Sequence, residues 1–92
     1  MATIYATNIT ADTLIKAGAG KFYGFTVNSH TGGTLKVWDS TAASGKVINN
    51  TITFAAGSGI TTFFSEGINF STGLFADVGG TIDLTVYWGD LE

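Results

Sequence analysis

The chain has 92 residues, a formal net charge of −3 and no cysteine, which predicts one domain, 1–92, without disulfides or thiolate metal sites. Its lysines are few and scattered and it has no arginine, so it lacks the clustered basic face that a nucleic-acid-binding protein needs. No apolar run approaches the roughly 20 residues of a membrane helix, and Met1–Tyr5 shows no secretory signal. We therefore expect neither a nucleic acid nor a membrane as a partner.

The composition is poor in charge and rich in aromatic residues. Charged residues make up 12% of the chain, where about 25% is typical of soluble domains. Aromatic residues make up 13%, and the polar residues are mostly threonine, serine, asparagine and glycine. Such a chain has too little charge to present a fully solvated surface, which is a first indication of a partner.

The first part of the chain predicts two short strands followed by a hairpin. Thr3–Asn8 and Asp12–Ala17 read as short strands, and Gly18–Gly20 interrupts the pattern. Lys21–Ser40 contains two further alternating runs, separated by Ser29–Gly33, whose small residues tolerate positive φ. We predict that the chain reverses there, so that Lys21–Ser40 forms a central β-hairpin against which the other strands lie.

The two halves of this hairpin each have two different faces. Aromatic and β-branched residues recur with a period of two, which is typical of a strand whose faces differ. The residues on the more apolar face of each half are Tyr23, Phe25, Val27, Leu35 and Val37. Phe22 and Trp38 fall on the opposite faces.

The rest of the chain alternates strand patterns with turns and loops. Further strands are predicted at Val47–Ile48, Thr51–Ala55, Thr61–Ser65, Ile68–Phe70, Gly73–Asp77 and Thr81–Trp88. Turns or loops are predicted at Asp39–Gly45, Asn49–Asn50, Gly57–Gly59, Glu66–Gly67 and Val78–Gly80. The last strand is the clearest of these, with one face formed by Ile82, Leu84, Val86 and Trp88.

These patterns predict an all-β fold. No apolar period of 3.6 residues extends over ten residues, so we expect essentially no helix. Seven to nine short strands with turn signals about every 8–12 residues predict an antiparallel β-sandwich or jelly roll.

Large aromatic residues occur as adjacent pairs at Phe22-Tyr23, Phe63-Phe64 and Tyr87-Trp88. Neighbours on a strand point to opposite faces, so one ring of each pair fills the core and the other faces outward. The outer rings either lie flat on the surface or are covered by neighbouring subunits. Small size, low charge and the lack of disulfides favour a homo-oligomer. The residues predicted at the interface are Phe22, Tyr23, Trp38, Phe63, Phe64, Tyr87 and Trp88.

No pattern of catalytic or metal-binding residues is present. His30 is the only histidine, and no nucleophile or carboxylate stands at a defined offset from it, so a solvated or capping role is expected. Gly18–Lys21 lacks the residues and the helix of a phosphate-binding loop. The aspartates lack the D-x-D-x-D spacing of a calcium loop, and turn roles are expected for Asp39 and Asp77 rather than a site shared with Asp83 and Asp90. We predict neither an enzyme nor a cofactor nor a metal site.

Several segments resemble a known group of proteins. These are Lys16–Gly20, Phe22–Ser29, His30–Asp39, Phe70–Phe75 and Gly79–Tyr87. Together they cover most of the chain from Lys16 on, and they resemble small β-sandwich structural proteins of tailed bacteriophage virions, of the capsid decoration, cement or head-fibre type. The matching features are glycines, small polar residues and strand patterns, so the resemblance concerns architecture and assigns no functional residue.

The resemblance implies a homotrimer on the exterior of the capsid in the virion, where it binds the major capsid protein and stabilises the shell. The predicted interface rings would then contact other subunits or the shell. An alternative is a tail or fibre module that binds a host-surface glycan, because flat rings such as Trp38 and Trp88 stack on sugars. Packing in the core or an interface is the competing explanation for both tryptophans. A third possibility is a free-standing interaction domain inside the cell.

Overall fold

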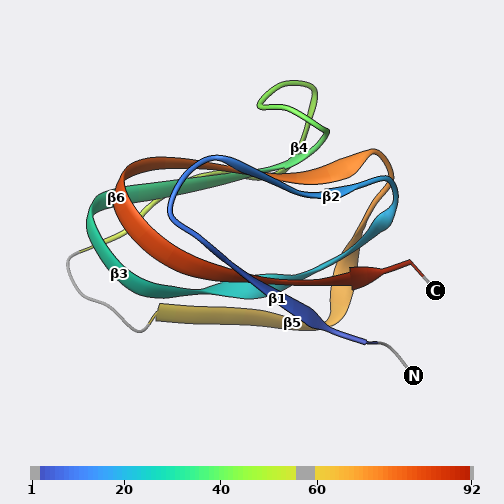
Figure 1. Ribbon diagram of the computed structural model, residues 1–92, viewed down its shortest axis with the longest axis horizontal. Helices are drawn as coiled ribbons and strands as arrows, with labels where there is room; N and C mark the ends of the chain where they lie inside the picture. The colour runs from blue at the N-terminus through green and yellow to red at the C-terminus, as the bar shows by residue number, and fades with distance from the viewer. Residues whose placement is uncertain (1–2, 56–59, 92) are drawn as a thin grey trace.

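The computed structural model describes residues 3–55 and 60–91, so the predicted loop Gly57–Gly59 lies outside the described residues. The described residues form strands that pair only in antiparallel fashion (Figure 1). Within these ranges there is no helix, and hence none long and apolar enough to cross a bilayer. The predicted all-β class is therefore confirmed. The strands are β1 (Tyr5–Ile9), β2 (Thr13–Ala17), β3 (Gly20–Asp39), β4 (Lys46–Thr53), β5 (Ile60–Phe70) and β6 (Gly73–Asp90).

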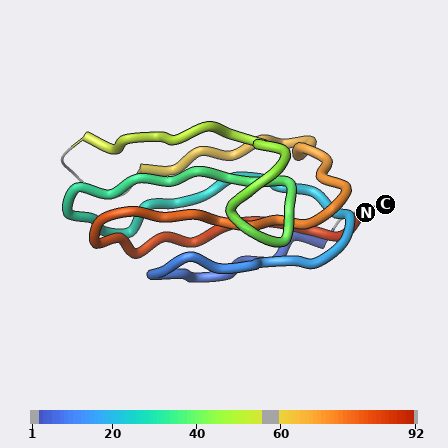
Figure 2. The backbone as a smooth tube through the Cα atoms, turned by 90° about the horizontal axis from the view of Figure 1, so that it is seen from above, coloured from blue at the N-terminus to red at the C-terminus, as the bar shows by residue number. Residues whose placement is uncertain are grey.

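The sheet consists of four runs of chain that lie side by side, and each run is antiparallel to its neighbours. β3 and β6 pair along almost their whole lengths and form the centre. β1 and β2 follow one another along the outer side of β6, and β4 and β5 do the same along β3. Figure 2 shows the runs side by side, with the β1–β2 run and the β4–β5 run at the two edges.

This sheet folds across its middle so that its two halves face each other (Figure 1). The first layer contains β1, β5, the N-terminal half of β3 and the C-terminal half of β6. The second layer contains β2, β4, the C-terminal half of β3 and the N-terminal half of β6. Two facing antiparallel layers are compatible with a β-sandwich.

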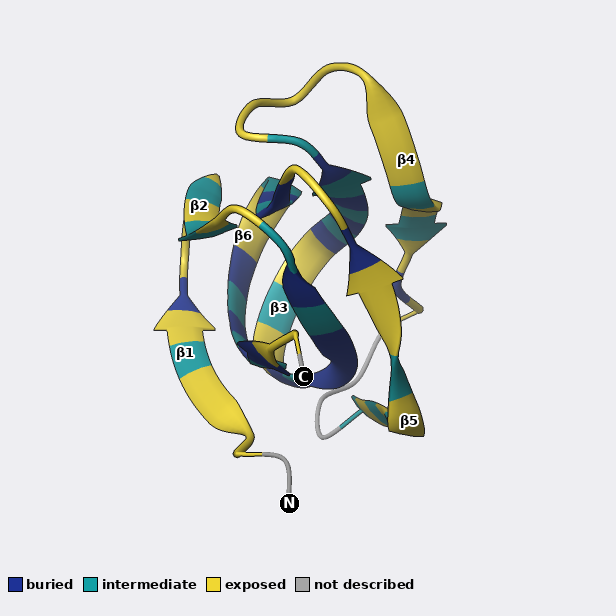
Figure 3. Ribbon diagram, turned by 90° about the vertical axis from the view of Figure 1, so that its right-hand side faces the viewer, coloured by how far each residue is buried: buried dark blue, intermediate teal, exposed yellow. Residues whose placement is uncertain are grey.

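The core lies between the two layers. β3 and β6 contribute most of the buried residues, while β1, β4 and β5 are mostly exposed (Figure 3). Leu35 and Val37 are buried, as are Ile82, Leu84 and Val86, so the faces predicted for these two strand segments are confirmed. Burial of apolar surface at about 25 cal/mol per Å² is the main force that holds the layers together.

The predicted central hairpin is wrong. β3 runs from Gly20 to Asp39 without reversing, and both of its halves pair with β6. The chain does bend at the predicted turn, Ser29–Gly33, but it passes there from the first layer to the second. Its partner β6 bends at the same place, and Gly32 and Gly80 supply positive φ on the two strands. A segment of small residues can form either a turn or a bend. It bends here because its partner strand, β6, continues alongside it.

Other predicted turns also lie inside strands. Asn49–Asn50 falls within β4, Glu66–Gly67 within β5 and Val78–Gly80 within β6. The described residues therefore contain six strands, three of them long, rather than seven to nine short ones. Register shifts in the pairing with β3 take up the irregular residues without ending the strands.

The predicted faces of Phe22 and Tyr23 are exchanged. Phe22 belongs to the core between the layers, whereas Tyr23 stacks on Phe63. The register of β3 shifts between Phe22 and Gly24. A bulge of this kind adds one residue and reverses the alternation on one side of it. The alternation predicted for Phe25 and Val27 is unaffected, since both are buried in the core.

Candidate interaction surface

The aromatic residues predicted at an interface lie in different environments. Phe22 is 1% exposed and Tyr23 is 3% exposed, so the chain itself covers both. Phe63 is 51% exposed and is the most open large hydrophobic residue among those described. The remaining ones, Trp38, Phe64, Tyr87 and Trp88, are half-buried. The surface that these rings offer is thus concentrated around Phe63 on the first layer and Trp38 on the second.

The outer face of the second layer carries a row of apolar side chains, which we call the apolar stripe. Trp38 pairs with Val47 of β4 and with Phe75 of β6, and Phe75 pairs with Leu14 of β2. Directly paired residues lie on the same face of a sheet. Leu14 is 40% exposed and Val47 is 37% exposed, at the two ends of the row. The stripe therefore crosses all four strands of this layer.

Trp38 lies at the centre of the apolar stripe, and the ammonium group of Lys36 lies over its ring. The Lys36 ammonium lies 4.3 Å from the centroid of the Trp38 ring, a distance at which the cation is attracted to the ring face. Lys36 pairs in the sheet with Asp77 of β6. The indole Nε1 of Trp38 is buried and has no hydrogen-bond partner in the part of the chain that the structure describes.

The outer face of the first layer carries the most exposed ring. Phe63 stacks on Tyr23, with ring centroids 6.0 Å apart and an interplanar angle of 16°, and meets Tyr87 edge-on at 6.3 Å. Offset-stacked and edge-to-face geometries are the favourable ones for aromatic pairs. Two ring contacts therefore fix Phe63 although half of its surface is open.

Next to these rings lies a network of hydroxyl and amide groups. The Tyr87 hydroxyl is 2.8 Å from Thr26 Oγ1, which is 3.1 Å from Thr61 Oγ1. Asn28 Nδ2 donates to Thr85 Oγ1 at 3.2 Å. These residues come from β3, β5 and β6 and lie on one face because the register aligns Thr26 with both Thr61 and Thr85.

The hydrogen bonds of Asn28 belong to a second set on the same face, which holds a carboxylate between two amides. Asn8 Nδ2 donates to Asp83 Oδ1 at 2.7 Å, and Asn28 Nδ2 donates to the same oxygen at 3.1 Å. The hydrogen bond from Asn8, followed by that from Asn28, lowers the pKa of Asp83 below its ordinary value. Asp83 is therefore an ionised hydrogen-bond acceptor on this face at neutral pH. The residues that form the contact are 55 and 75 positions away from Asp83 in the sequence.

Trp88 lies near the C-terminal end of β6 and is half-buried by its own chain. Tyr5 packs on it with ring centroids 4.8 Å apart, and the Lys16 ammonium lies 5.9 Å from the ring. The indole Nε1 donates to Thr7 Oγ1 at 2.9 Å. Lys16 also forms an ion pair with Asp90 at 3.2 Å. These contacts tie β1 and β2 to the end of β6.

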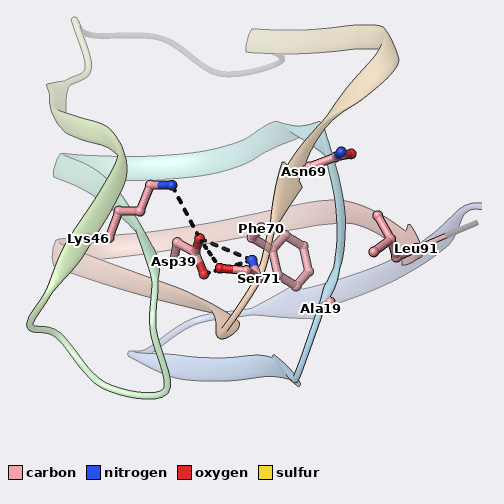
Figure 4. Close-up of a pocket in the computed structure, with 7 residues that line it drawn as sticks. All are labelled: Ala19, Asp39, Lys46, Asn69, Phe70, Ser71 and Leu91. Carbon is pink, nitrogen blue, oxygen red and sulfur yellow. Dashed lines mark hydrogen bonds and ion pairs between the residues drawn. The ribbon is translucent and has the colours of Figure 1, made fainter.

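Asp39 is a buried carboxylate beside a cavity of about 270 Å³. Its Oδ1 accepts hydrogen bonds from the backbone N–H groups of Ser71, Thr72 and Gly73 at 3.1, 2.8 and 3.3 Å. Figure 4 shows Lys46 and Ser71 converging on this carboxylate, and Lys46 Nζ lies 3.9 Å from Oδ2. Asp39 therefore holds the connection between β5 and β6 in place. The turn role expected from the sequence concerned only its own segment of chain.

The pKa of Asp39 reflects opposing causes. Burial raises the pKa, but the backbone N–H groups of Thr72, Ser71 and Gly73 and the charge of Lys46 lower it by more. The net pKa lies below the ordinary value of an aspartate. All the polar partners of this carboxylate hold the chain in place, so we assign it a structural role.

His30 links the strands where the sheet folds. Its Nε2 donates to the carbonyl oxygen of Ala55 at 2.7 Å, and its Nδ1 accepts from the N–H of Gly33 at 3.2 Å. Its ring also packs against Phe54 with centroids 5.7 Å apart. These contacts match the capping role expected from the sequence, and they fix the tautomer with the proton on Nε2.

The described residues hold no group of three or more histidine, cysteine, aspartate or glutamate side chains that could bind a metal ion. Asp39 and Asp83 lie in separate networks, with separate partners. Comparison of the chain with protein-family models, curated proteins and solved structures found no match. In the part of the chain that the structure describes, the apolar stripe and the outer face of the first layer around Phe63 are the candidate interaction surfaces.

Proposed function

We propose that the protein is a structural protein of a phage virion, a capsid decoration or cement protein that binds the major capsid protein shell as a homotrimer and stabilises it. The apolar stripe, with Trp38 at its centre, is the observation that carries the proposal, together with the resemblance of the sequence to such proteins. An aromatic anchor surrounded by aliphatic contacts is the usual centre of a protein interface. The low charge of the chain limits the number of ions that binding must desolvate.

The size of the molecule supports binding as an oligomer. The Cα atoms span 36 Å along the strands and 17 Å across them. One face of a layer therefore covers roughly 600 Å², whereas each partner in a standard interface buries about 800 Å². A single copy therefore offers a small contact area. Three linked copies that bind together gain from a high effective concentration once the first has bound.

The native mass of the purified protein tests the oligomer. Light scattering across a dilution series is expected to give an oligomer, because exposed apolar side chains on a small, weakly charged domain favour association. The resemblance implies a mass three times that of the 9.6 kDa chain. A mass that stays at one chain down to micromolar concentration would contradict the trimer in solution.

A charge placed in the apolar stripe tests shell binding. Val47→Lys is expected to weaken binding to undecorated shells at least tenfold, because burying an unpaired ammonium in an apolar contact is costly. Val47 is 37% exposed on an edge strand, so the free protein should still fold. The measurement is co-sedimentation with shells and the shift in their disassembly temperature.

Ser65→Lys is the matched control for this experiment. It introduces the same charge at an exposed position of β5, in the other layer. It is expected to bind shells as the unmodified protein does. Equal binding by the Val47→Lys protein, or no binding and no stabilisation by the unmodified protein, would remove the basis of the proposal.

A module that binds a host-surface glycan is the second candidate, and one observation favours it. Sugar stacking needs an open ring, and Tyr5 and Lys16 cover Trp88 while Lys36 covers Trp38. Phe63 is open and has polar groups beside it. The tryptophans that suggested this function from the sequence are thus poorly placed for it, and Phe63 is well placed.

A further inference from the structure

The outer face of the first layer combines a fixed ring with fixed hydrogen-bonding groups. Phe63 is held by Tyr23 and Tyr87, and the hydroxyls of Thr26 and Thr61 lie in the next row of the sheet. Groups that are already held in place lose little conformational entropy when a ligand binds. The face is therefore preorganised, although it is partly open to solvent.

The charged and polar groups on this face indicate which class of ligand it can bind. Asp83 is the ionised group of the network, and two amides already hold its Oδ1. The other members are threonine hydroxyls, asparagine amides and the Tyr87 hydroxyl, which can each donate or accept further hydrogen bonds. The described groups around Asp83 include no cation with which to bind a phosphate, a sulfate or an acidic chain. Lys21 lies on the same face beside Tyr23, and its ammonium donates to the carbonyl oxygen of Glu66 at 3.4 Å. The set suits an uncharged molecule with many hydroxyl groups, whose C–H faces can stack on a ring.

The distance between Tyr87 and Asp83 on this face indicates how long a ligand must be to contact both ends. Tyr87, beside Phe63, and Asp83 are four residues apart on one strand, which corresponds to about 14 Å at about 3.4 Å per residue. A monosaccharide cannot span this distance, whereas a chain of several sugars can. A protein partner is disfavoured on this face because its centre holds hydroxyl, amide and carboxylate groups, whereas the core of a protein interface is depleted of charged residues.

We propose that the outer face of the first layer binds a neutral oligosaccharide chain. The Phe63 ring stacks on the C–H face of one sugar, and Asp83, Asn28 and Thr85 hydrogen-bond to hydroxyls further along the same chain. The ligand class is that of the second candidate function, but the inference does not require a virion. The register places the apolar stripe on the second layer, and the two layers face each other across the core (Figure 1), so the outer faces of both layers can be occupied at once.

The test is an NMR titration of the full chain with three neutral hexasaccharides, cellohexaose, maltohexaose and chitohexaose, with glucose as the short control. At least one hexasaccharide is expected to shift amide signals on β3, β5 and β6 around Phe63 and Asp83 at millimolar concentration or below. Glucose should bind at least tenfold more weakly than that hexasaccharide. Phe63→Ala is expected to weaken binding at least tenfold, while Phe63→Tyr keeps the ring and should stay within about threefold of the unmodified protein.

Two further variants separate binding from folding. Asp83→Asn is expected to weaken binding severalfold, and the place of this half-buried side chain on the outer face leaves the core intact. Val47→Ala, in the apolar stripe, should leave sugar binding unchanged. The inference is overturned if none of the hexasaccharides shifts these signals, if Phe63→Ala with a native amide spectrum binds like the unmodified protein, or if the shifts fall on the apolar stripe. Each of these results leaves shell binding through the apolar stripe untouched, so the two proposals fail separately.

Discussion

Replacing Asp39 with asparagine is expected to lower the free energy of unfolding by about 3 kcal/mol at pH 7. Three backbone N–H groups, of Ser71, Thr72 and Gly73, donate to one oxygen of this buried carboxylate. An asparagine can keep its one oxygen toward these N–H groups, but it has no charge, and hydrogen bonds to a charged acceptor are the stronger ones. Its NH₂ group takes the place of Oδ2, which accepts from the N–H and hydroxyl of Ser71 and faces the Lys46 ammonium. Urea unfolding followed by tryptophan fluorescence measures the difference.

The pH dependence of this difference follows from the lowered pKa of Asp39. A carboxyl whose pKa is lower in the folded than in the unfolded protein binds a proton more readily when unfolded. Its contribution to stability is fully present above the unfolded pKa of about 3.9 and is lost as pH falls through the folded pKa. The gap between the unmodified protein and Asp39→Asn should therefore be constant from pH 7 to about pH 5 and shrink below about pH 4. Asp83 titrates in both proteins, so its effect cancels.

Asp90→Asn is the matched control for the loss of charge. Asp90 pairs with Lys16, but its side chain is 62% exposed, and exposed ion pairs contribute about 0–1 kcal/mol. Asp90→Asn should therefore cost less than about 1 kcal/mol at pH 7. If Asp39→Asn costs no more than this control, the carboxylate does not hold the β5–β6 connection in the way described.

The alternation of apolar and polar residues was sufficient to predict the fold class. Leu35 and Val37 on β3, and Leu84 and Val86 on β6, lie in the core as their spacing indicates. Each of these segments is regular, so its period of two is not interrupted. The same reasoning was wrong for Tyr23, because a bulge next to Gly24 shifts the alternation. A bulge has only a weak local signal, since a single glycine in a strand is compatible with several backbone paths.

The strand connectivity could not be predicted because turns and bends have the same local signal. Ser29–Gly33 has the small residues of a hairpin turn, but whether a chain reverses or bends there depends on which strand lies beside it. That partner is β6, whose paired residues are about fifty positions further along the chain. Long-range pairing of this kind is not written in the composition of either segment.

The candidate surfaces were predicted only in part. The pair Phe63-Phe64 indicated one outward ring, and the structure places Phe63 outward. No local pattern indicated that Asn8 and Asn28 meet at Asp83, or that Leu14 and the other residues of the apolar stripe line up, because each group joins separate strands. Outward positions on the strands could be assigned by alternation, but their alignment needs the register.

The bend of β3 against β6 predicts unequal effects of two similar substitutions. Gly80 has φ +72° and Gly32 has φ +62°, and the two lie on the paired strands where the sheet folds. A Cβ at Gly80 would clash with the carbonyl oxygen of Gly32, whereas a Cβ at Gly32 would meet nothing within 4 Å. Gly32→Ala therefore pays only for the left-handed backbone, about 1 kcal/mol, while Gly80→Ala must also separate the strands.

We expect Gly80→Ala to lower the free energy of unfolding by about 3 kcal/mol, the sum of backbone strain and overpacking against a neighbouring strand. Urea unfolding of both variants at pH 7 measures the contrast. In the hairpin predicted from sequence, Gly32 and Gly80 would lie in separate turns without touching, and both substitutions would cost about the same. Equal losses would thus favour the hairpin and contradict the folded sheet. A clearly larger loss for Gly80→Ala than for Gly32→Ala is the result expected of two strands that cross the bend in contact.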